Sequence, residues 1–164
     1  MEIAVNRSVS LEAPGAMRPG LRQSLRAVID VSEQWLAPAL DFGIRLLLAS
    51  VFFNSGLTKI ASWSTTLALF DGEYMVPFLS PEVAAWLGTG AELFFPVLLV
   101  LGLGARFAAI GLFVLNAVAV ISYPDLSEAG LKDHQYWGLL LLVVALHGPG
   151  RLSLDRLIRG KWLG

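Results

Sequence analysis

Apolar residues form runs along this chain that are long enough to cross a lipid bilayer. The runs predict membrane-spanning helices at about residues 36–60, 83–103, 105–123 and 134–147. At about 1.5 Å per helical residue, twenty residues cover roughly 30 Å, the thickness of a hydrocarbon core. The last run is the shortest, so we expect its ends to be recessed in the protein or the bilayer to be thin there. Residues 35–150 are therefore predicted to form an all-α, integral membrane four-helix bundle.

Amphipathic segments precede and follow the predicted bundle. From Leu21 onward, apolar residues recur at helical spacing among charged ones, which is typical of a helix lying on a membrane surface. We expect residues 1–34 to form a flexible cytoplasmic N-terminus that ends in this helix, the alternative being an ordinary solvated lead-in. Residues 151–164 are predicted to form an amphipathic cytoplasmic tail, with Ser153 as the N-cap of its helix. Between the first two spans we expect an interfacial loop with a short helix near Ser64–Phe70.

The composition supports a membrane location and excludes several kinds of site. With 55% hydrophobic residues and a mean hydropathy of +0.66, the chain is too apolar for a soluble globule of 164 residues. The absence of cysteine excludes disulfides, thiol nucleophiles and iron–sulfur clusters. The sequence contains no glycine-rich nucleotide fingerprint, Walker loop or HExxH motif, and we expect no nucleic-acid partner.

Basic residues are concentrated at the two ends of the chain. Four of the twelve Lys and Arg residues precede the first span and four follow the fourth, whereas the loops after the first and third spans hold six acidic residues. Cytoplasmic segments of membrane proteins carry the excess of Lys and Arg. The distribution therefore predicts a multi-pass protein with both termini in the cytoplasm and the lipid bilayer as a partner.

Glu92 lies near the middle of the second apolar run and is its only ionisable residue. A carboxylate at that depth costs about 2.5–3.5 kcal/mol on insertion scales, so it should face protein or a water-filled cavity. On the predicted topology, further polar side chains lie in the outer half of the membrane. Together they suggest an outward-facing polar cavity. The candidate residues for ligand binding or proton relay are Glu92, Lys59, Asn54, Asn116, His134 and Gln135.

Several kinds of chemistry are open to these groups. A buried Glu beside a Lys or His can relay protons, hold a cation, or bind the carbonyl and hydroxyl groups of a quinone-like ligand. A structural alternative is a Glu92 that is protonated or paired with Lys59 and only sets the helix register. Lys59 could instead snorkel to the interface, and Asn54 could make an interhelical hydrogen bond. A histidine at a membrane boundary, such as His134, is usually an interfacial polar residue.

Haem and metal sites are not expected. His134 and His147 are about 20 Å apart along one predicted helix, so they cannot ligate the same haem. The sequence gives no reason to expect a covalent cofactor or a bound metal. Among the candidates considered, a quinone is the cofactor that the polar residues of the spans would suit.

Charged residues near the cytoplasmic ends of the spans are interpreted as structural. Asp41 and Arg45 are four residues apart on one helix face, so they can form an ion pair. Arg106 follows the tight turn that contains Gly102 and Gly104, at the same end of the bundle. We therefore expect Asp41, Arg45 and Arg106 to make structural ion pairs.

Three motifs in the chain resemble the DoxX family of small four-helix bacterial membrane proteins. They are RLLLASVFFNSGLTKI, GTGAELFFPVLLVLGLGARFAA and DHQYWGLLLLVVALHGPGRLSLD, which together cover roughly Asp41 to Asp155. The matching residues, besides the HGPGRLSLD tail, are Arg45, Gly56, Lys59, Glu92, Arg106 and His134. The second and third motifs are most similar to members that accompany machinery for modified metal-binding peptides. The resemblance implies a protein of the bacterial inner (plasma) membrane.

The resemblance implies an association with membrane redox or maturation complexes. Some members of the family are similar to a subunit of a thiosulfate:quinone oxidoreductase, and others are associated with membrane redox complexes. Because this chain has no redox centre of its own, we expect a non-catalytic or quinone-interacting subunit of a membrane redox or maturation complex, with a protein partner. Whether it is catalytic and whether it forms a homo-oligomer are left open. The alternatives are a small transporter or channel for a proton, metal ion or small solute, and a membrane scaffold or chaperone without a ligand.

Overall fold

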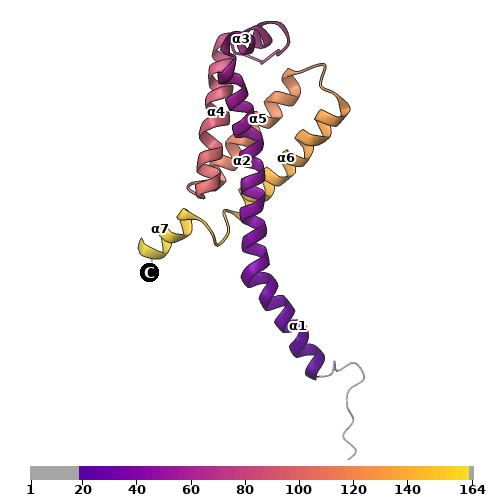
Figure 1. Ribbon diagram of the computed structural model, residues 1–164, viewed down its shortest axis with the longest axis vertical. Coiled ribbons are helices and arrows are strands. Elements are labelled where there is room, and N and C mark those ends of the chain that lie inside the picture. Colours follow the sequence, from indigo (N-terminus) through magenta and orange to yellow (C-terminus); the bar gives the residue numbers. More distant parts are fainter. Residues whose placement is uncertain (1–18, 163–164) are drawn as a thin grey trace, which may run out of the picture. The chain divides into compact units, whose positions relative to one another are not determined.

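The computed structural model describes residues 19–162, and this part of the chain is helical and contains no β-strand (Figure 1). The predicted all-α fold class is confirmed. The chain divides into two compact units, one ending at Leu36 and the other beginning at Ala37. Residues 1–18, for which we expected flexibility, lie outside the described residues.

The first unit consists of α1, Pro19–Val31, and a π-helical stretch, η1, Ser32–Leu36. Pro19 suits the start of a helix, because the N–H that proline lacks has no partner in a first turn. Large apolar side chains of α1 are exposed beside its charged ones. They include Leu25, Val28, Ile29 and Val31. This pattern is typical of a helix that lies on a membrane surface.

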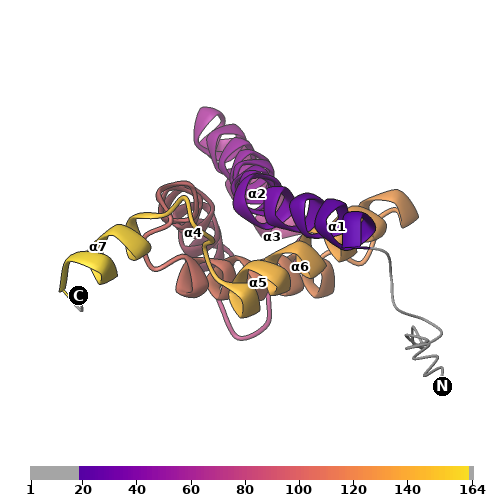
Figure 2. The ribbon, with the colours of Figure 1, turned by 90° about the horizontal axis from the view of Figure 1, so that it is seen from below.

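The second unit is built around four helices that close into a ring. They are α2 (Ala37–Ala61), α4 (Pro81–Leu101), α5 (Ala105–Ser122) and α6 (Glu128–His147). α2 packs against α4 and α6, and α5 packs between α4 and α6. In the view of Figure 2, α4, α5 and α6 curve around one side of α2. The largest side chains of the core that they enclose are Leu48, Phe52, Leu99, Leu112 and Leu141.

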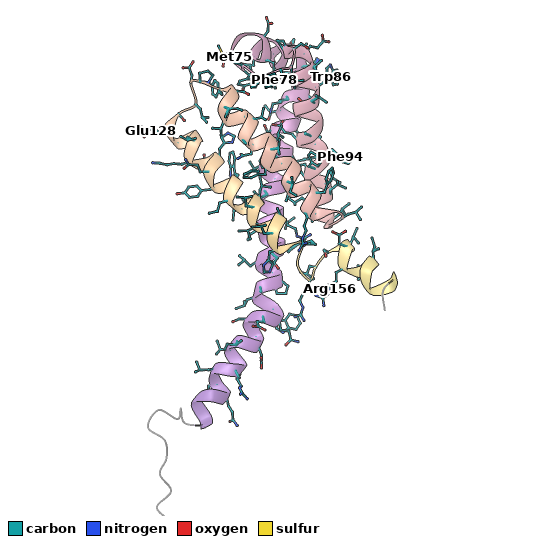
Figure 3. The ribbon with its side chains drawn as sticks, turned by 180° about the vertical axis from the view of Figure 1, so that it is seen from behind. Met75, Phe78, Trp86, Phe94, Glu128 and Arg156 are labelled. Carbon is teal, nitrogen blue, oxygen red and sulfur yellow. The ribbon has the colours of Figure 1, made fainter. Side chains whose placement is uncertain are left out.

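The length and composition of the helices suit a membrane. Among the described residues, three helical stretches are long and apolar enough to cross one: the stretch that contains α2, and the helices α4 and α5. The outward faces are apolar as well. Trp86 and Phe94 project away from the bundle (Figure 3) and are 60% and 57% exposed. An apolar surface of this extent is unfavourable in water and indicates contact with lipid.

α6 differs from the predicted fourth span. The sequence predicts a span over residues 134–147, whereas α6 begins at Glu128. The earlier start has a local cause, because the Ser127 hydroxyl accepts a hydrogen bond from the Gly130 amide (3.1 Å) and caps the first turn. The added turns carry charge, so α6 is not among the three stretches that suit a membrane by length and composition. Its place in the bundle follows from its packing against α5 and α2.

Shorter helices lie at the two ends of the bundle. α3, Trp63–Gly72, packs against α2 and α4 at one end (Figure 1) and extends the short helix expected near Ser64–Phe70. α7, Leu154–Trp162, lies at the other end of α4, where Arg156 is labelled in Figure 3. The Ser153 hydroxyl accepts a hydrogen bond from the Arg156 amide (3.4 Å), the contact expected of an N-cap.

Candidate ligand site

An ion pair between α2 and α4 lies inside the bundle. Lys59 Nζ is 2.7 Å from Glu92 Oε1 and 2.6 Å from Glu92 Oε2. Ser55, one turn before Lys59, donates a hydrogen bond to Glu92 Oε1 (3.2 Å) and accepts one from Lys59 Nζ (2.8 Å). The side chains of Lys59 and Glu92 are only 20% and 12% exposed. The pair therefore neutralises two charges in a place where either one alone would be costly.

The close approach of α2 and α4 at this point depends on Gly56. A Cβ atom at Gly56 would lie 2.8 Å from Leu93 Cδ2 and 3.1 Å from Glu92 Cβ. A larger residue would therefore push α4 away from α2. Small residues allow helices to pack closely in membranes. Gly56 thus brings the backbone of Glu92 near enough to α2 for its carboxylate to meet Lys59.

The ion pair lies on the wall of a cavity of about 570 Å³. The walls come from α2, α4, α5 and α6, and residues of α3 and of the α3–α4 and α5–α6 connections complete the lining. Most lining side chains are apolar. The polar lining residues are Ser55, Lys59, Tyr74, Glu92, Ser122, Tyr123 and His134. A largely apolar cavity of this size with a few polar groups is typical of a site for a small organic molecule.

We infer from the exposure of two lining residues that the cavity opens between α4 and α5. Leu87 of α4 and Val114 of α5 line the cavity, yet they are 59% and 55% exposed. Nearer the α4–α5 turn the gap is filled by Phe95, because a Cβ atom on Gly111 would lie 2.6 Å from its ring. Figure 1 shows α4 and α5 separating from the turn toward the end that carries α3. The mouth is apolar and lies within the length of two membrane-spanning helices, so we infer that it faces lipid.

His134 lines the α6 side of the cavity and is held there by Asn116 of α5. Asn116 Nδ2 donates to the backbone carbonyl of His134 (2.9 Å), and Asn116 Oδ1 lies 2.7 Å from His134 Nδ1. Gly138, one turn further along α6, leaves space for this amide, because a Cβ atom there would lie 3.2 Å from Asn116 Nδ2. The His134 ring also packs edge-on against Trp137, with 5.0 Å between ring centroids. The orientation of the His134 ring is thus determined by its neighbours.

Two further polar groups of the lining come from outside the predicted site. The Ser122 side chain is buried, and among the described residues its hydroxyl has no hydrogen-bond partner. Buried hydroxyls are normally hydrogen-bonded, so the Ser122 hydroxyl is an exception in the lining. Burial raises the pKa of the Tyr74 phenol above its ordinary value near 10, and the neighbouring Tyr123, Glu73 and Glu92 add to the shift. Tyr74 therefore presents an uncharged hydroxyl at neutral pH.

The structure brings together part of the predicted site. Those of its residues that line the cavity are Glu92, Lys59 and His134. Asn116 does not line the cavity but supports His134. Asn54 and Gln135 are exposed and do not line the cavity. Each of them lies one position from a lining residue, and one step along a helix turns a side chain by about 100° to another face.

Ser55, Ser122 and Tyr74 are absent from the predicted site. The four-residue spacing of Ser55 and Lys59 on one helix face was a signal that could have indicated the first of them. Ser122 and Tyr74 belong to segments that meet only in the folded chain. The Met75 amide donates a hydrogen bond to the Ser122 carbonyl (2.7 Å) and joins these two segments. A local sequence pattern could not have predicted that contact.

Arg45 is fully buried near the α4–α5 turn, and its partners differ from those predicted. Its guanidinium donates hydrogen bonds to the carbonyls of Leu99 (3.2 Å) and Val100 (3.3 Å), and to the carbonyl of Leu152. Carbonyls at the end of a helix lack intrahelical donors, so a cation satisfies them well. The hydrogen bonds of Arg45 therefore go to the backbone rather than to the carboxylate of Asp41.

Other charged groups at this end of the bundle also bind helix termini. Arg106 donates to the last two carbonyls of α6, at 3.3 Å and 3.5 Å. The carboxylate of Asp155 accepts hydrogen bonds from the amides of Gly104 (2.9 Å) and Ala105 (3.3 Å), where α5 begins. Gly102 is left-handed (φ 66°), and a Cβ atom there would lie 2.6 Å from the Arg45 guanidinium. These residues hold the helix ends together and lie apart from the cavity.

The fold and the cavity define a class, a helical membrane bundle with an internal ion pair on the wall of a largely apolar cavity. A sequence model of the DoxX family matches residues 40–124, which include Lys59, Glu92 and Asn116. An uncharacterized protein of Haemophilus influenzae (strain ATCC 51907 / DSM 11121 / KW20 / Rd) is 36% identical over 125 residues, which are 71% of this chain and 81% of that protein. The chain therefore belongs to the DoxX family. No solved structure matches it.

Proposed function

We propose that this protein binds a quinone-like molecule in the cavity and acts as a subunit of a redox or maturation complex in the bacterial inner membrane. The observation that carries the proposal is the Lys59–Glu92 pair on the wall of an otherwise mostly apolar cavity of about 570 Å³. The volume falls within the usual range of roughly 300–1,000 Å³ for small-molecule sites. The three N–H donors of Lys59 go to Ser55 and to the two carboxylate oxygens of Glu92, and one of them can turn to a ligand carbonyl while the other two hold the ammonium group in place.

The position of the mouth supports an amphiphilic ligand. A molecule with an aromatic head and an apolar tail dissolves in the bilayer and can reach an opening that lies between two membrane-spanning helices. Its head would enter the cavity past Leu87 and Val114, and its tail would stay among the lipid chains. A water-soluble ligand would gain nothing from an apolar mouth at that depth.

The proposal is tested by ligand binding to the protein reconstituted in lipid nanodiscs. Decyl-quinone binding is followed by quenching of the intrinsic tryptophan fluorescence, for the wild type, Glu92→Gln and the control Glu82→Gln. Glu82 lies in the exposed first turn of the same helix. Glu92→Gln should weaken binding by about tenfold or more, because it breaks a charge-assisted hydrogen bond that orients Lys59. Unsaturable binding, or equal loss in both variants, would overturn the proposal.

Cation transport is the competing function, and the ion pair argues against it. Lys59 Nζ contacts both carboxylate oxygens of Glu92, which are the oxygens that a metal ion would need. Among the described residues, no three His, Asp or Glu side chains cluster in a way that could hold a metal ion. A proton or metal flux into liposomes that Glu92→Gln abolishes would favour transport. The other alternative is a scaffold without a ligand. In that case the Glu92→Leu variant should keep both its protein partner and its activity.

The proposed topology places both termini in the cytoplasm, and labelling can test it. The chain contains no cysteine, so one introduced cysteine becomes a unique reactive site. Asp125 lies in the α5–α6 connection and Gly160 in α7, and both are exposed. In intact cells a membrane-impermeant maleimide should label Asp125→Cys and spare Gly160→Cys. The reverse pattern would place the mouth of the cavity in the opposite leaflet.

A further inference from the structure

The hydrogen-bonding role of the His134 imidazole is determined by Asn116, which does not line the cavity. A backbone carbonyl can only accept a hydrogen bond, so the Asn116 atom that contacts the His134 carbonyl must be the Nδ2 donor. The other amide atom, Oδ1, is therefore the acceptor that lies 2.7 Å from His134 Nδ1. Nδ1 must then carry the proton of this hydrogen bond.

A neutral imidazole has one protonated nitrogen and one lone pair. With the proton held at Nδ1, the lone pair of His134 is at Nε2. The Nδ1 edge of the ring faces Asn116, so the ring edge that carries Nε2 is the one left to line the cavity. Among the described residues, no group is hydrogen-bonded to Nε2. The cavity therefore contains an acceptor without a donor.

We propose that His134 accepts a hydrogen bond from a ring hydroxyl of the ligand, so that the cavity prefers a hydroquinone or other phenolic head to the quinone or an ether. This inference rests on the proposed function and names the chemical form of the ligand that the site selects. Asn116 acts as a positioning residue, because it holds the tautomer without touching the ligand. Ser122, another lining residue, has a buried hydroxyl that lacks a hydrogen-bond partner among the described residues.

The binding test compares two stable probes that differ only in their hydroxyl groups, decyl-hydroquinone and its dimethyl ether, under anaerobic conditions. The wild type should bind the hydroquinone about threefold to tenfold more tightly, the usual contribution of one neutral hydrogen bond. His134→Phe keeps a ring against Trp137 but has no acceptor, so it should remove this preference. His134→Gln places an amide oxygen near the position of Nε2 and should restore part of it. Tyr136→Phe is the matched control, since Tyr136 is 64% exposed on the same helix.

A second measurement keeps the inference testable if His134→Phe is poorly folded. The chain has two histidines, so nitrogen NMR of the variant His147→Gln reports on His134 alone. The spectrum should show a protonated Nδ1 and an unprotonated Nε2, and Asn116→Leu should produce a mixture of tautomers. A protonated Nε2 in the otherwise unchanged site would overturn the inference.

The outcomes separate the two proposals. If decyl-quinone and both probes fail to bind to the wild type, the proposed function fails and this inference fails with it. If decyl-quinone binds and the hydroquinone does not, only this inference fails. If both probes bind and His134→Phe keeps the preference for the hydroquinone, the cavity binds the ligand but His134 does not select its hydroxyl. Only a preference that is lost in His134→Phe, partly regained in His134→Gln and unchanged in Tyr136→Phe supports the inference.

Discussion

Removing Lys59 tests whether the ion pair neutralises Glu92 inside the bundle. Lys59→Met keeps the length of the side chain but leaves the carboxylate of Glu92 with the Ser55 hydroxyl as its remaining side-chain partner. Because the Glu92 side chain is only 12% exposed, water replaces the lost ammonium poorly. Breaking a buried pair by removing one partner typically costs about 3–5 kcal/mol. The cost has a ceiling, since the carboxylate can take up a proton, which for glutamate at pH 7 costs about 3.7 kcal/mol.

We therefore expect Lys59→Met to lower the free energy of unfolding by about 2–4 kcal/mol at pH 7. The ceiling falls by about 1.4 kcal/mol for each unit of pH below 7, so the loss should shrink on going to pH 5.5. Glu92→Gln should cost less than Lys59→Met, because Lys59 lies close to the end of α2 and its flexible side chain can reach the interface. The double variant Lys59→Met/Glu92→Leu leaves no buried charge and should recover most of the stability.

Reversible unfolding in mixed micelles, followed by tryptophan fluorescence, measures these differences. Lys59→Met, Glu92→Leu and the double variant Lys59→Met/Glu92→Leu form a cycle with the wild type, and its coupling energy isolates the interaction of the two side chains. A Lys59→Met protein within about 0.5 kcal/mol of the wild type would refute the reasoning. So would a double variant that is as unstable as the sum of the two single ones, because the two residues would then act independently.

Three other substitutions test the mouth, the helix contact and a helix cap. Val114→Trp should fill the mouth and weaken decyl-quinone binding at least about threefold, whereas Ile110→Trp, one turn away on the same exposed face, should leave titrations unchanged. Gly56→Val should lower the free energy of unfolding by about 1–3 kcal/mol through overpacking against α4. The control is Gly43→Ala, which should not destabilise the protein, because a Cβ atom at Gly43 would meet nothing within 4 Å. Asp155→Ala should lower the free energy of unfolding by about 1 kcal/mol, because two amides at the start of α5 lose their acceptor. An unchanged thermal unfolding curve would contradict this role of Asp155.

The central part of the site could be predicted from the sequence because its signal is local. One glutamate in the middle of a long apolar run must find a partner or a cavity, and Lys59 was a candidate partner within the preceding span. Two of the outer candidate residues do not line the cavity. Asn54 and Gln135 are exposed, although each lies next to a lining residue, because helix rotation is determined by packing and not by composition.

The sequence by itself determined the class of this protein and the position of Glu92 near the middle of an apolar run. Its apolar runs are long enough that water cannot be the solvent of the outward faces, and every backbone polar group in them must be satisfied within a helix. Tertiary structure alone decided which polar groups share the cavity, where its mouth opens, and that Arg45 binds helix-end carbonyls rather than Asp41. The physical reason is that these features depend on rotations and contacts between helices far apart in the chain, for which the periodicity of one helix carries no information.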